Sequence, residues 1–369
     1  MKRLKIGILG TRGIPNRYGG FEEFAQYLSK GLVARGHDVY VYSPHTHPYQ
    51  FAEWEGVHII HCKDPGNLIG AGGQFFYDLH CNNDARRRAF DVLLHLGYTT
   101  DSIWCWRWPR STAHVVNMDG MEWKRSKHAG PVRLFLKWAE WLAARNAAAL
   151  VADSEPMQRY FIDTYGVPAT HLSYGARLFT KPDDAALTRF NITPNGYFLL
   201  IARMEPENNI GMILQGYQQS GSRFPLVVIG NETSHEKRIR NQYVHPGIRF
   251  IGPVYDRNTL DNLRFFCAAY FHGHSVGGTN PSLLEAMACG CPIAAHDNPF
   301  NRAVLGEDSS YFLNAGDIAD IIDYRMSEVS NILRRENNRE KIRTKYNEEK
   351  NIDDYEELLI RVHNGNKHH

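Results

Sequence analysis

The chain has 369 residues, of which 43% are hydrophobic and 12% aromatic. At about 150 residues per domain this predicts two domains with real cores, and it excludes a disordered chain, collagen and a small disulfide-rich protein. The 42 Lys and Arg nearly balance the 40 Asp and Glu, leaving a net charge of +2, which argues against a dedicated nucleic-acid-binding protein.

Strands and helices are predicted to alternate along the first half. An apolar run at 4–9 predicts a buried strand, and apolar residues at helical spacing over 21–32 predict an amphipathic helix that ends near Gly36. The strand at 38–42 completes a βαβ unit, which begins a parallel sheet. Further strands are predicted at 57–61, 92–96, 114–118 and 149–152, and helices at 131–144 and 155–164.

The second half repeats this pattern. Gly, Pro, Asp and Thr interrupt it over 174–195, as expected for a linker between domains. Two consecutive doubly wound α/β domains are therefore predicted, with ligands at the carboxyl ends of the strands, in the crevice between the domains. The later strands are predicted at 197–202, 226–230, 248–251, 268–272 and 292–295, followed by a charged helix at 328–347 and an amphipathic segment at 355–362.

Cysteine spacing and hydropathy bear on location. The six cysteines lack the spacing of zinc or redox sites and are interpreted as buried thiols in a reducing compartment. The first apolar run is too short for a signal peptide, and no run of 18 apolar residues occurs. We therefore expect a cytoplasmic protein, soluble or at the periphery of the membrane.

The segment 271–290 carries the strongest chemical signal, a glycine-rich turn between a strand and a helix. Asn280 is a good N-cap and Pro281 suits the first helical position. We expect the free amides of Thr279, Asn280 and Ser282 to form an anion site that the helix dipole assists. Glu285, one turn further on, is placed to accept two hydrogen bonds from a ribose diol. The alternative is a capped core helix with one solvated carboxylate.

This segment resembles the signature of the retaining GT-B glycosyltransferases of the large family 4. Residues 285–292, Glu-Ala-Met-Ala-Cys-Gly-Cys-Pro, match closely, but Gly277 replaces the family's first glutamate, which contacts the donor sugar. In the segment 201–209, Arg203 matches the arginine that holds the donor diphosphate, and Asn208 replaces the family's lysine. The segment 19–22 resembles the Gly-Gly-x-Glu that opens the family's first helix. The resemblance covers essentially the whole chain.

The resemblance implies an α/β chain with the GT-B fold, two Rossmann-like doubly wound domains facing each other across a cleft. We expect an acceptor-binding domain at 1–178 and a nucleotide-sugar-binding domain at 190–345. The remaining residues, 346–369, are expected to form a helix that packs back on the N-terminal domain.

Three segments, 10–15, 117–125 and 272–281, are similar to one subgroup of bacterial polysaccharide transferases, which resemble the β-1,4-rhamnosyltransferases of capsule synthesis. This resemblance implies retaining transfer of L-rhamnose from dTDP-rhamnose to a lipid-diphosphate-linked saccharide, although nothing in the sequence decides between a dTDP- and a UDP-sugar. It implies neither a metal nor another cofactor.

We predict site residues from these motif matches and from the positions of polar residues just after predicted strands. The catalytic candidates are Arg203, Asp119 and His274. The candidates for the donor diphosphate and sugar are Asn208, Gly277, Gly278, Thr279, Asn280, Ser282, Gly19 and Gly20. Glu285 is the ribose candidate, and Arg12, Tyr18 and Glu122 are the acceptor-side candidates. For Asp119 the alternative is a simple Asp-Gly turn, and for His274 an ordinary loop histidine.

Aromatic and cationic residues mix in the segments 104–110 and 125–141. Such a mixture suits an anionic membrane surface, where a lipid-linked acceptor lies. Buried tryptophans with arginine stems packed on them explain it equally well.

Three other functions compete with transfer. A sugar-nucleotide 2-epimerase shares the two-domain architecture, and a non-catalytic sugar-nucleotide binder would explain the missing glutamate and lysine. Binding of NAD is disfavoured because Gly7, Gly10 and Gly13 do not have the G-x-G-x-x-G spacing.

Overall fold

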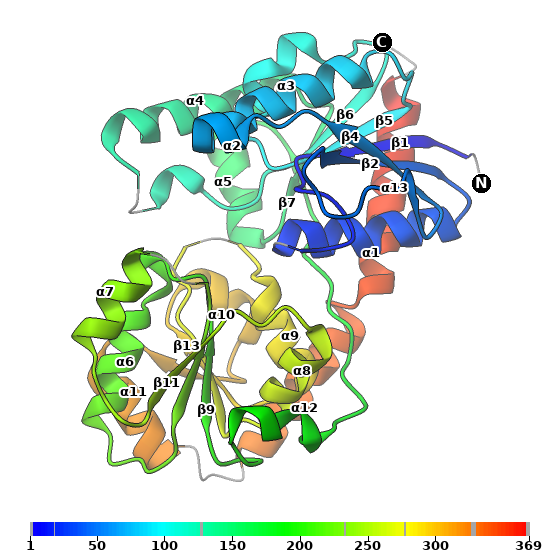
Figure 1. Cartoon of the computed structure of the whole chain (residues 1–369). Coiled ribbons are helices and arrows are strands. Elements are labelled where there is room, and N and C mark those ends of the chain that lie inside the picture. Colours follow the sequence, from blue (N-terminus) through cyan, green and yellow to red (C-terminus); the bar gives the residue numbers. More distant parts are fainter. Residues whose placement is uncertain are drawn as a thin grey trace. The chain divides into compact units, whose positions relative to one another are not determined.

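The structure, a computed structural model, divides the chain into two compact units. The first comprises Met1–Lys124, His128–Gly175 and Glu348–His369, and the second Arg125–Lys127 and Ala176–Asn347. Each unit holds one sheet flanked by helices (Figure 1). The residues described are 3–17, 19–125, 128–231, 234–276, 278–325 and 330–366.

The first unit is built on an eight-stranded sheet with the order β3-β4-β2-β1-β5-β6-β7-β8. Neighbouring strands are parallel except β3 and β4. The central strands β5 and β6 are buried along their whole length, as expected for a parallel sheet with helices on both faces. The strands are β1 (Lys5–Leu9), β2 (Asp38–Pro44), β3 (Glu53–Trp54), β4 (Val57–Cys62), β5 (Val92–Leu96), β6 (Ala113–Asn117), β7 (Ala149–Ala152) and β8 (Ala169–His171).

The helices of this unit fall into two groups, one on each face of the sheet, according to the direction in which the chain crosses from strand to strand. The connection from β1 to β2 crosses the sheet in the opposite direction to those from β4 to β5, β5 to β6 and β6 to β7. Because such crossovers are right-handed, α1 covers one face, and α3, η2 and α4 cover the other. The helices are α1 (Gly20–Ala34), α2 (Gly66–Ile69), η1 (Gly70–Gly72), α3 (Gly73–Ala85), η2 (Ser102–Arg107), η3 (Glu122–Lys124), α4 (Gly130–Asn146), α5 (Glu155–Tyr165) and α13 (Glu348–Asn366).

The last helix, α13, packs against α1 in the first unit. The ring of Tyr355 lies 5.0 Å from that of Phe24, and its hydroxyl accepts a hydrogen bond from Asn117 Nδ2 over 3.0 Å. Glu356 Oε1 lies 2.9 Å from His37 Nε2, with both side chains largely buried. The C-terminal segment is therefore part of the core of the first unit.

The second unit has a six-stranded parallel sheet with the order β11-β10-β9-β12-β13-β14. Its strands are β9 (Phe198–Ile201), β10 (Leu226–Ile229), β11 (Ile248–Gly252), β12 (Ala269–His272), β13 (Ile293–His296) and β14 (Ser310–Phe312). Its helices are η4 (Asp184–Phe190), η5 (Pro206–Asn208), α6 (Ile210–Gln219), α7 (Ser234–Gln242), α8 (Arg257–Phe265), α9 (Pro281–Cys289), α10 (Pro299–Leu305), α11 (Ala315–Asp320), η6 (Ile321–Arg325) and α12 (Ser330–Thr344).

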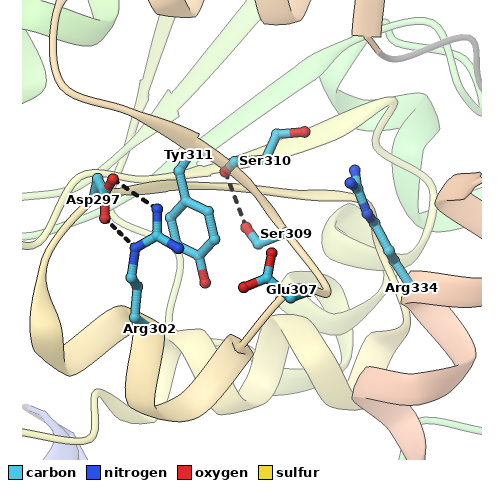
Figure 2. A pocket seen from close by; sticks show the side chains of 7 residues that line it. All are labelled: Asp297, Arg302, Glu307, Ser309, Ser310, Tyr311 and Arg334. Atoms are coloured by element: carbon cyan, nitrogen blue, oxygen red, sulfur yellow. Dashed lines mark hydrogen bonds and ion pairs between the residues drawn. The ribbon is translucent and has the colours of Figure 1, made fainter.

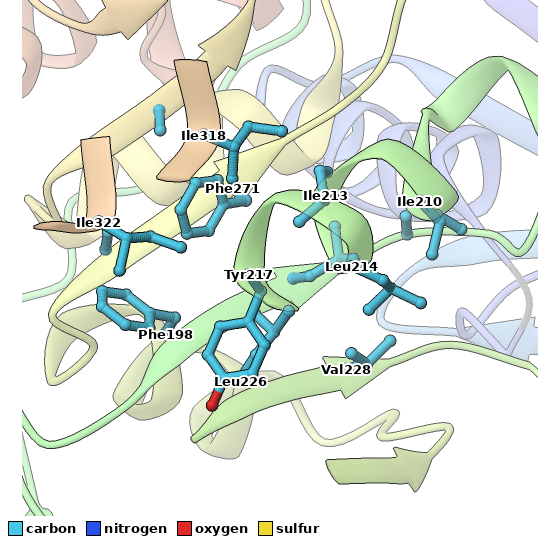
Figure 3. Close-up of a cluster of buried hydrophobic side chains, with 14 of the residues drawn as sticks. Phe198, Ile210, Ile213, Leu214, Tyr217, Leu226, Val228, Phe271, Ile318 and Ile322 are labelled. Carbon is cyan, nitrogen blue, oxygen red and sulfur yellow. The ribbon is translucent and has the colours of Figure 1, made fainter. Parts of the chain in front are cut away.

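A cluster of buried side chains fixes α6 and α11 to this sheet (Figure 3). Ile213 and Leu214 from α6 and Ile318 from α11 pack with Phe198 and Phe271 from neighbouring strands. Two loops leave the carboxyl edge of the same sheet: the β9 loop, residues 202–209, and the β12 loop, residues 273–280 without Gly277, which lies outside the described residues.

The sequence-based fold class is confirmed, because both sheets are doubly wound and parallel apart from β3. The expected linker over 174–195 differs in one respect, since it contains the helix η4. Asp183 caps η4 by accepting a hydrogen bond from the amide of Ala185, and Leu187 is buried. Among the residues that the structure describes, none of the helices combines the length and apolar character of a membrane span.

Candidate functional site

Hydrogen bonds tie the β9 loop to the β12 loop. The strands β9 and β12 are parallel neighbours, so both loops leave the same edge of the sheet. Asn209 Nδ2 donates to the carbonyl of Gly273 over 2.8 Å. The amide and hydroxyl of Ser275 donate to the carbonyl of Glu207 over 3.1 and 2.8 Å. The two loops therefore form one bonded element at the edge where doubly wound sheets bind ligands.

Gly273 permits this close approach. A Cβ atom at this position would lie 2.1 Å from the carbonyl oxygen of Asn208, well inside van der Waals contact. Any other residue would push the two loops apart, so a glycine is required here for packing rather than for its backbone angles.

Arg203 and Asn208, both in the β9 loop, have different environments. The Arg203 side chain is exposed. Asn208 is buried, and its Nδ2 donates to the backbone carbonyl of Arg203 over 2.7 Å. Asn208 thus shapes the loop that carries Arg203, and at the position of the family's lysine it brings no positive charge to a diphosphate.

His274 in the β12 loop is held as a neutral imidazole. Burial, together with the charges of Arg203 and Arg125, lowers its pKa to about 3. Its ring stacks on that of the fully buried His272, with centroids 4.3 Å apart and planes at 14°. Its Nδ1 is buried and has no hydrogen-bond partner in the described residues. A neutral histidine beside a cation can donate one hydrogen bond and accept another, but it adds no charge of its own.

Arg125 lies next to the candidate residues of these loops, although the sequence did not point to it as a donor-side residue. Its Nη1 lies 3.1 Å from Oε1 of Glu207 in the β9 loop, and both side chains are largely buried. Its charge reaches His274, as the lowered pKa of that histidine indicates. Arg125 and Glu207 are 82 residues apart, and nothing local in the sequence marks them as partners.

The start of α9 agrees with the expected capping and corrects one detail. Asn280 is the N-cap and Pro281 the first helical residue. However, Asn280 Oδ1 accepts the amide hydrogen of Ser282 over 2.9 Å, so this amide is not free as expected. Thr279 is buried and Gly278 half-buried in the turn before the cap. An anion here would rely on the helix dipole and the turn rather than on the Ser282 amide.

Glu285 is ion-paired rather than merely solvated. Its Oε2 contacts Nη2 of Arg264, which is almost completely buried, while 25% of the Glu285 side chain stays exposed. Arg264 Nη1 also lies 3.2 Å from Asp261 Oδ1, and its Nη2 lies 3.4 Å from Ser282 Oγ. Burial disfavours the charge of Arg264, but Glu285 and Asp261 hold its pKa above the usual value. This pair therefore fixes the carboxylate on the flank of α9.

Asp119 and Glu122 lie in the first unit, after β6. Asp119 has φ +49°, a left-handed conformation that Asp tolerates better than most residues. Its amide donates to Asn117 Oδ1 over 3.0 Å, so the side chain of Asn117, rather than that of Asp119, shapes the backbone here. Glu122 Oε1 lies 3.2 Å from His128 Nε2. The two acids sit at the carboxyl edge of the first sheet.

The segment between β1 and α1 holds the remaining candidates of the first unit. Arg12 is exposed, and its amide donates to Oε1 of the buried Glu22 over 2.8 Å. Burial raises the pKa of Glu22, and the bond from Arg12 opposes this shift. Gly19 is the N-cap of α1 and Gly20 its first residue, while Tyr18 lies outside the described residues. Glu22 thus ties this loop to α1.

A polar cavity of about 500 Å³ lies elsewhere in the second unit (Figure 2). Arg302 there donates to Asp297 through two nitrogens and lies over the ring of Tyr311, 4.2 Å from its centroid. None of the candidate residues lines it. Within the described part of the chain, no group of three or more His, Cys, Asp or Glu side chains is placed to hold a metal ion.

Both halves of the chain match models of known protein families. Residues 18–174 match Glycosyltransferase Family 4, and residues 189–347 match Glycosyl transferases group 1. The O-antigen chain mannosyltransferase B of Escherichia coli is 30% identical over 130 residues, 33% of this chain and 34% of that protein. The phosphatidyl-myo-inositol mannosyltransferase of Mycobacterium leprae (strain TN) is 26% identical over 210 residues, 54% of this chain and 53% of that protein. The chain thus spans about a third of the length of the first relative and about half of the length of the second.

Solved structures agree on the fold. The sucrose-phosphate synthase (tll1590) from Thermosynechococcus elongatus superposes with a TM-score of 0.82 at 14% identity, over 98% of this chain and 99% of that one. The Anabaena protein Alr3699/HepE, in complex with UDP and glucose, has a TM-score of 0.76 at 17% identity, over 97% of this chain and 100% of that one. With its two halves matched in turn and the fold shared along its length, the chain belongs to the GT-B glycosyltransferases of family 4.

Proposed function

We propose that this protein is a retaining glycosyltransferase that moves a sugar from a sugar nucleotide to a lipid-linked saccharide. The observation that carries the proposal is the bonded pair of loops after β9 and β12, in which the exposed Arg203 and the neutral His274 share one edge of the sheet. Parallel sheets of this kind bind nucleotides at that edge. The match to the family supports the same assignment.

In this proposal the leaving diphosphate is stabilised by fixed groups. Arg203 forms charge-assisted hydrogen bonds to the phosphates, and the turn before α9 adds the partial charge of a helix N-terminus. His274 donates its N–H to a phosphate or sugar oxygen. Because these groups are positioned before the reaction, they stabilise the charge that develops as the sugar departs.

Transfer with retention then needs no protein nucleophile. The bond between the anomeric carbon and the phosphate oxygen breaks while the acceptor hydroxyl attacks from the same face. The departing phosphate oxygen takes the hydroxyl proton. Asp119, Glu122 and Arg12 of the first unit are proposed to orient the acceptor.

The proposed donor is dTDP-L-rhamnose, on the strength of the subgroup motifs. Two relatives that match part of the chain are named mannosyltransferases, so the decisive test is a donor panel. Thermal unfolding should be followed with dTDP-rhamnose, UDP-glucose and GDP-mannose, because a ligand at about 100 times its Kd stabilises the folded state by about 2.7 kcal/mol. The stabilising donor is then incubated with a lipid-linked saccharide. Stabilisation by none of the sugar nucleotides would contradict the proposal.

A non-catalytic sugar-nucleotide binder is the second candidate, because Asn208 supplies no charge where the family has lysine. A binder would be stabilised by the donor but would form no product with any acceptor. An epimerase would convert the donor without an acceptor, whereas a transferase would only hydrolyse it slowly. Product analysis with and without acceptor separates the three.

Glu285→Gln is expected to weaken binding of UDP by roughly tenfold or more, since a hydrogen bond to a charged group contributes about 1.5–3 kcal/mol. The proposed partner in UDP is the ribose diol. The nucleotide of the proposed donor, dTDP, carries 2′-deoxyribose and offers only its 3′-hydroxyl, so the same variant should weaken binding of dTDP less than binding of UDP. Isothermal titration of both nucleotides with both proteins measures the difference. Equal affinity of wild type and variant for UDP would remove Glu285 from the ribose site.

Transfer is expected to continue undiminished in excess EDTA, because the proposed stabilisation of the diphosphate uses Arg203 and backbone groups. Initial rates with and without chelator measure this, and chelator pre-loaded with Mg²⁺ is the control. Loss of turnover that Mn²⁺ restores would show instead that a metal ion carries part of the leaving-group charge.

A further inference from the structure

Apolar side chains gather on the helical face of the first unit that is opposite to α1. Leu134, at 73% exposure, and Trp106, at 65%, are among the most exposed. The elements that carry these side chains contact one another, α2 with α3, α3 with η2, and η2 with α4, and Figure 1 shows α2, α3 and α4 close together. We call this set the aromatic face; it consists of Leu68, Ile69, Phe76, Trp106, Val132, Leu134, Trp138 and Trp141.

Only part of the tryptophan-rich sequence belongs to this face. Trp108 is buried and stacks on His95 and His114, with centroids 4.5 and 4.7 Å apart. Trp104 is half-buried, and its Nε1 donates to the carbonyl of Phe75 over 2.8 Å. These two rings have packing roles. Trp106, between them in the sequence, points outward, so its exposure is not explained by the core.

The aromatic face has a supporting layer that holds it in place. The rings of Phe75 and Phe135 lie 5.7 Å apart and join α3 to α4. Phe135 in turn packs against Trp138 at 5.9 Å. The exposed rings therefore stand on a packed base, and their positions are fixed by the fold.

Positive charge is interleaved with these apolar side chains. Arg133, Lys137 and Arg145 are exposed on α4. Arg145 lies over the ring of Trp141 at 6.0 Å, and Arg107 over that of Trp106 at 4.9 Å. The acidic residues of α2, α3, η2 and α4 do not offset this positive charge at the surface. Asp78 and Glu140 are buried, and Asp84 is paired with Arg88.

We propose that the aromatic face docks on the anionic surface of a phospholipid bilayer. Tryptophan and leucine enter the interfacial region while lysine and arginine contact lipid phosphates. A symmetric second copy fits less well, because a twofold contact would bring Arg133, Lys137 and Arg145 against their own like charges. The purpose of docking rests on the proposed function, since a lipid-linked acceptor lies in that surface.

Vesicle flotation tests this with purified full-length protein and no acceptor. Vesicles of phosphatidylcholine with about a third phosphatidylglycerol should bind the protein, and pure phosphatidylcholine should bind it less. The double variant Leu134→Ser/Trp138→Ser should lower the bound fraction at least tenfold. The double variant Arg133→Gln/Lys137→Gln should make binding less sensitive to salt, while Arg107 and Arg145 retain part of the electrostatic attraction. The matched control is Val244→Ser/Leu313→Ser, which removes two similarly exposed apolar side chains from the second unit and should bind like wild type.

Transfer to a short, water-soluble acceptor should be unchanged in the Leu134/Trp138 variant, because neither residue belongs to the donor site. A wild-type protein that stays with the soluble fraction, or a variant that floats as well as wild type, would overturn the docking proposal. Dimerisation that the same variant abolishes, measured by analytical ultracentrifugation, would assign the face to a second copy instead. Intact vesicle binding without transfer to any acceptor would contradict the proposed function alone.

Discussion

Arg203→Ala is expected to lower the transfer rate by about 10²- to 10³-fold, the effect of removing one positioned donor from a developing oxyanion. The side chain is exposed, and the β9 loop is held by the Arg203 carbonyl rather than by its guanidinium. Folding should therefore be unaffected. Because Asn208 brings no charge to this loop, Arg203 is the cation of the β9 loop on which the proposed stabilisation depends.

The measurement is kcat with saturating donor, together with a thermal unfolding curve for each variant. Arg223→Ala is the matched control, because Arg223 is an exposed arginine of the same unit outside both loops. Arg203→Lys should recover part of the rate, since lysine keeps the charge but not the forked geometry. If Arg203→Ala turns over at the wild-type rate, Arg203 does not contact the diphosphate.

Arg264→Met is expected to destabilise the second unit by about 3–5 kcal/mol, the range for removing one partner of a buried ion pair. Arg264 is only 2% exposed and contacts Glu285, Asp261 and Ser282. Without it, Glu285 loses this ion pair, and Asp261 keeps its longer ion-pair contact with Arg257 at 3.9 Å. Nucleotide affinity should fall as well, because Glu285 would lose the contact that orients it.

Thermal or urea unfolding measures the first effect and titration with UDP the second. The double variant Arg264→Met/Glu285→Gln is the informative comparison, since it removes both charges of the pair. It should regain part of the lost stability but none of the lost affinity. Were the single variant as stable as wild type, the pair would not hold the flank of α9.

The alternating pattern predicted most strands because strands in parallel sheets are short, fully apolar runs. The strand Leu226–Ile229 is such a run and is buried throughout. Helix α3 did not emerge from the pattern, because its buried face mixes the polar Asp78 and Asn82 with the apolar residues Tyr77, Cys81 and Ala85. Asp78 on this face accepts from Thr100 Oγ1 over 2.6 Å, and burial raises its pKa. Apolar periodicity is a weak signal in a helix where some of the buried side chains are polar and form hydrogen bonds with residues distant in the sequence.

Candidate site residues could be predicted only where one short segment carries the motif. Arg203 and His274 came from local motifs, and the cap at Asn280 from local preference. The ion pairs of Arg125 with Glu207 and of Arg264 with Glu285 join residues far apart in the sequence. Nothing local marks such partners. The tryptophans at 104–108 make the same point, because neighbouring residues of one type differ in exposure once η2 has formed.

The position of the last helix, α13, determines when the first unit can complete its folding. Its aromatic core includes Tyr355 against Phe24, and Glu356 closes on His37, so more than 300 residues separate these partners along the chain. During synthesis the first unit cannot complete its core until the entire second unit has left the ribosome. Until then, the surface of α1 that α13 covers stays exposed. A chain stalled or cleaved before residue 348 would expose this surface of α1 to chaperones and proteases, although its second unit had already folded.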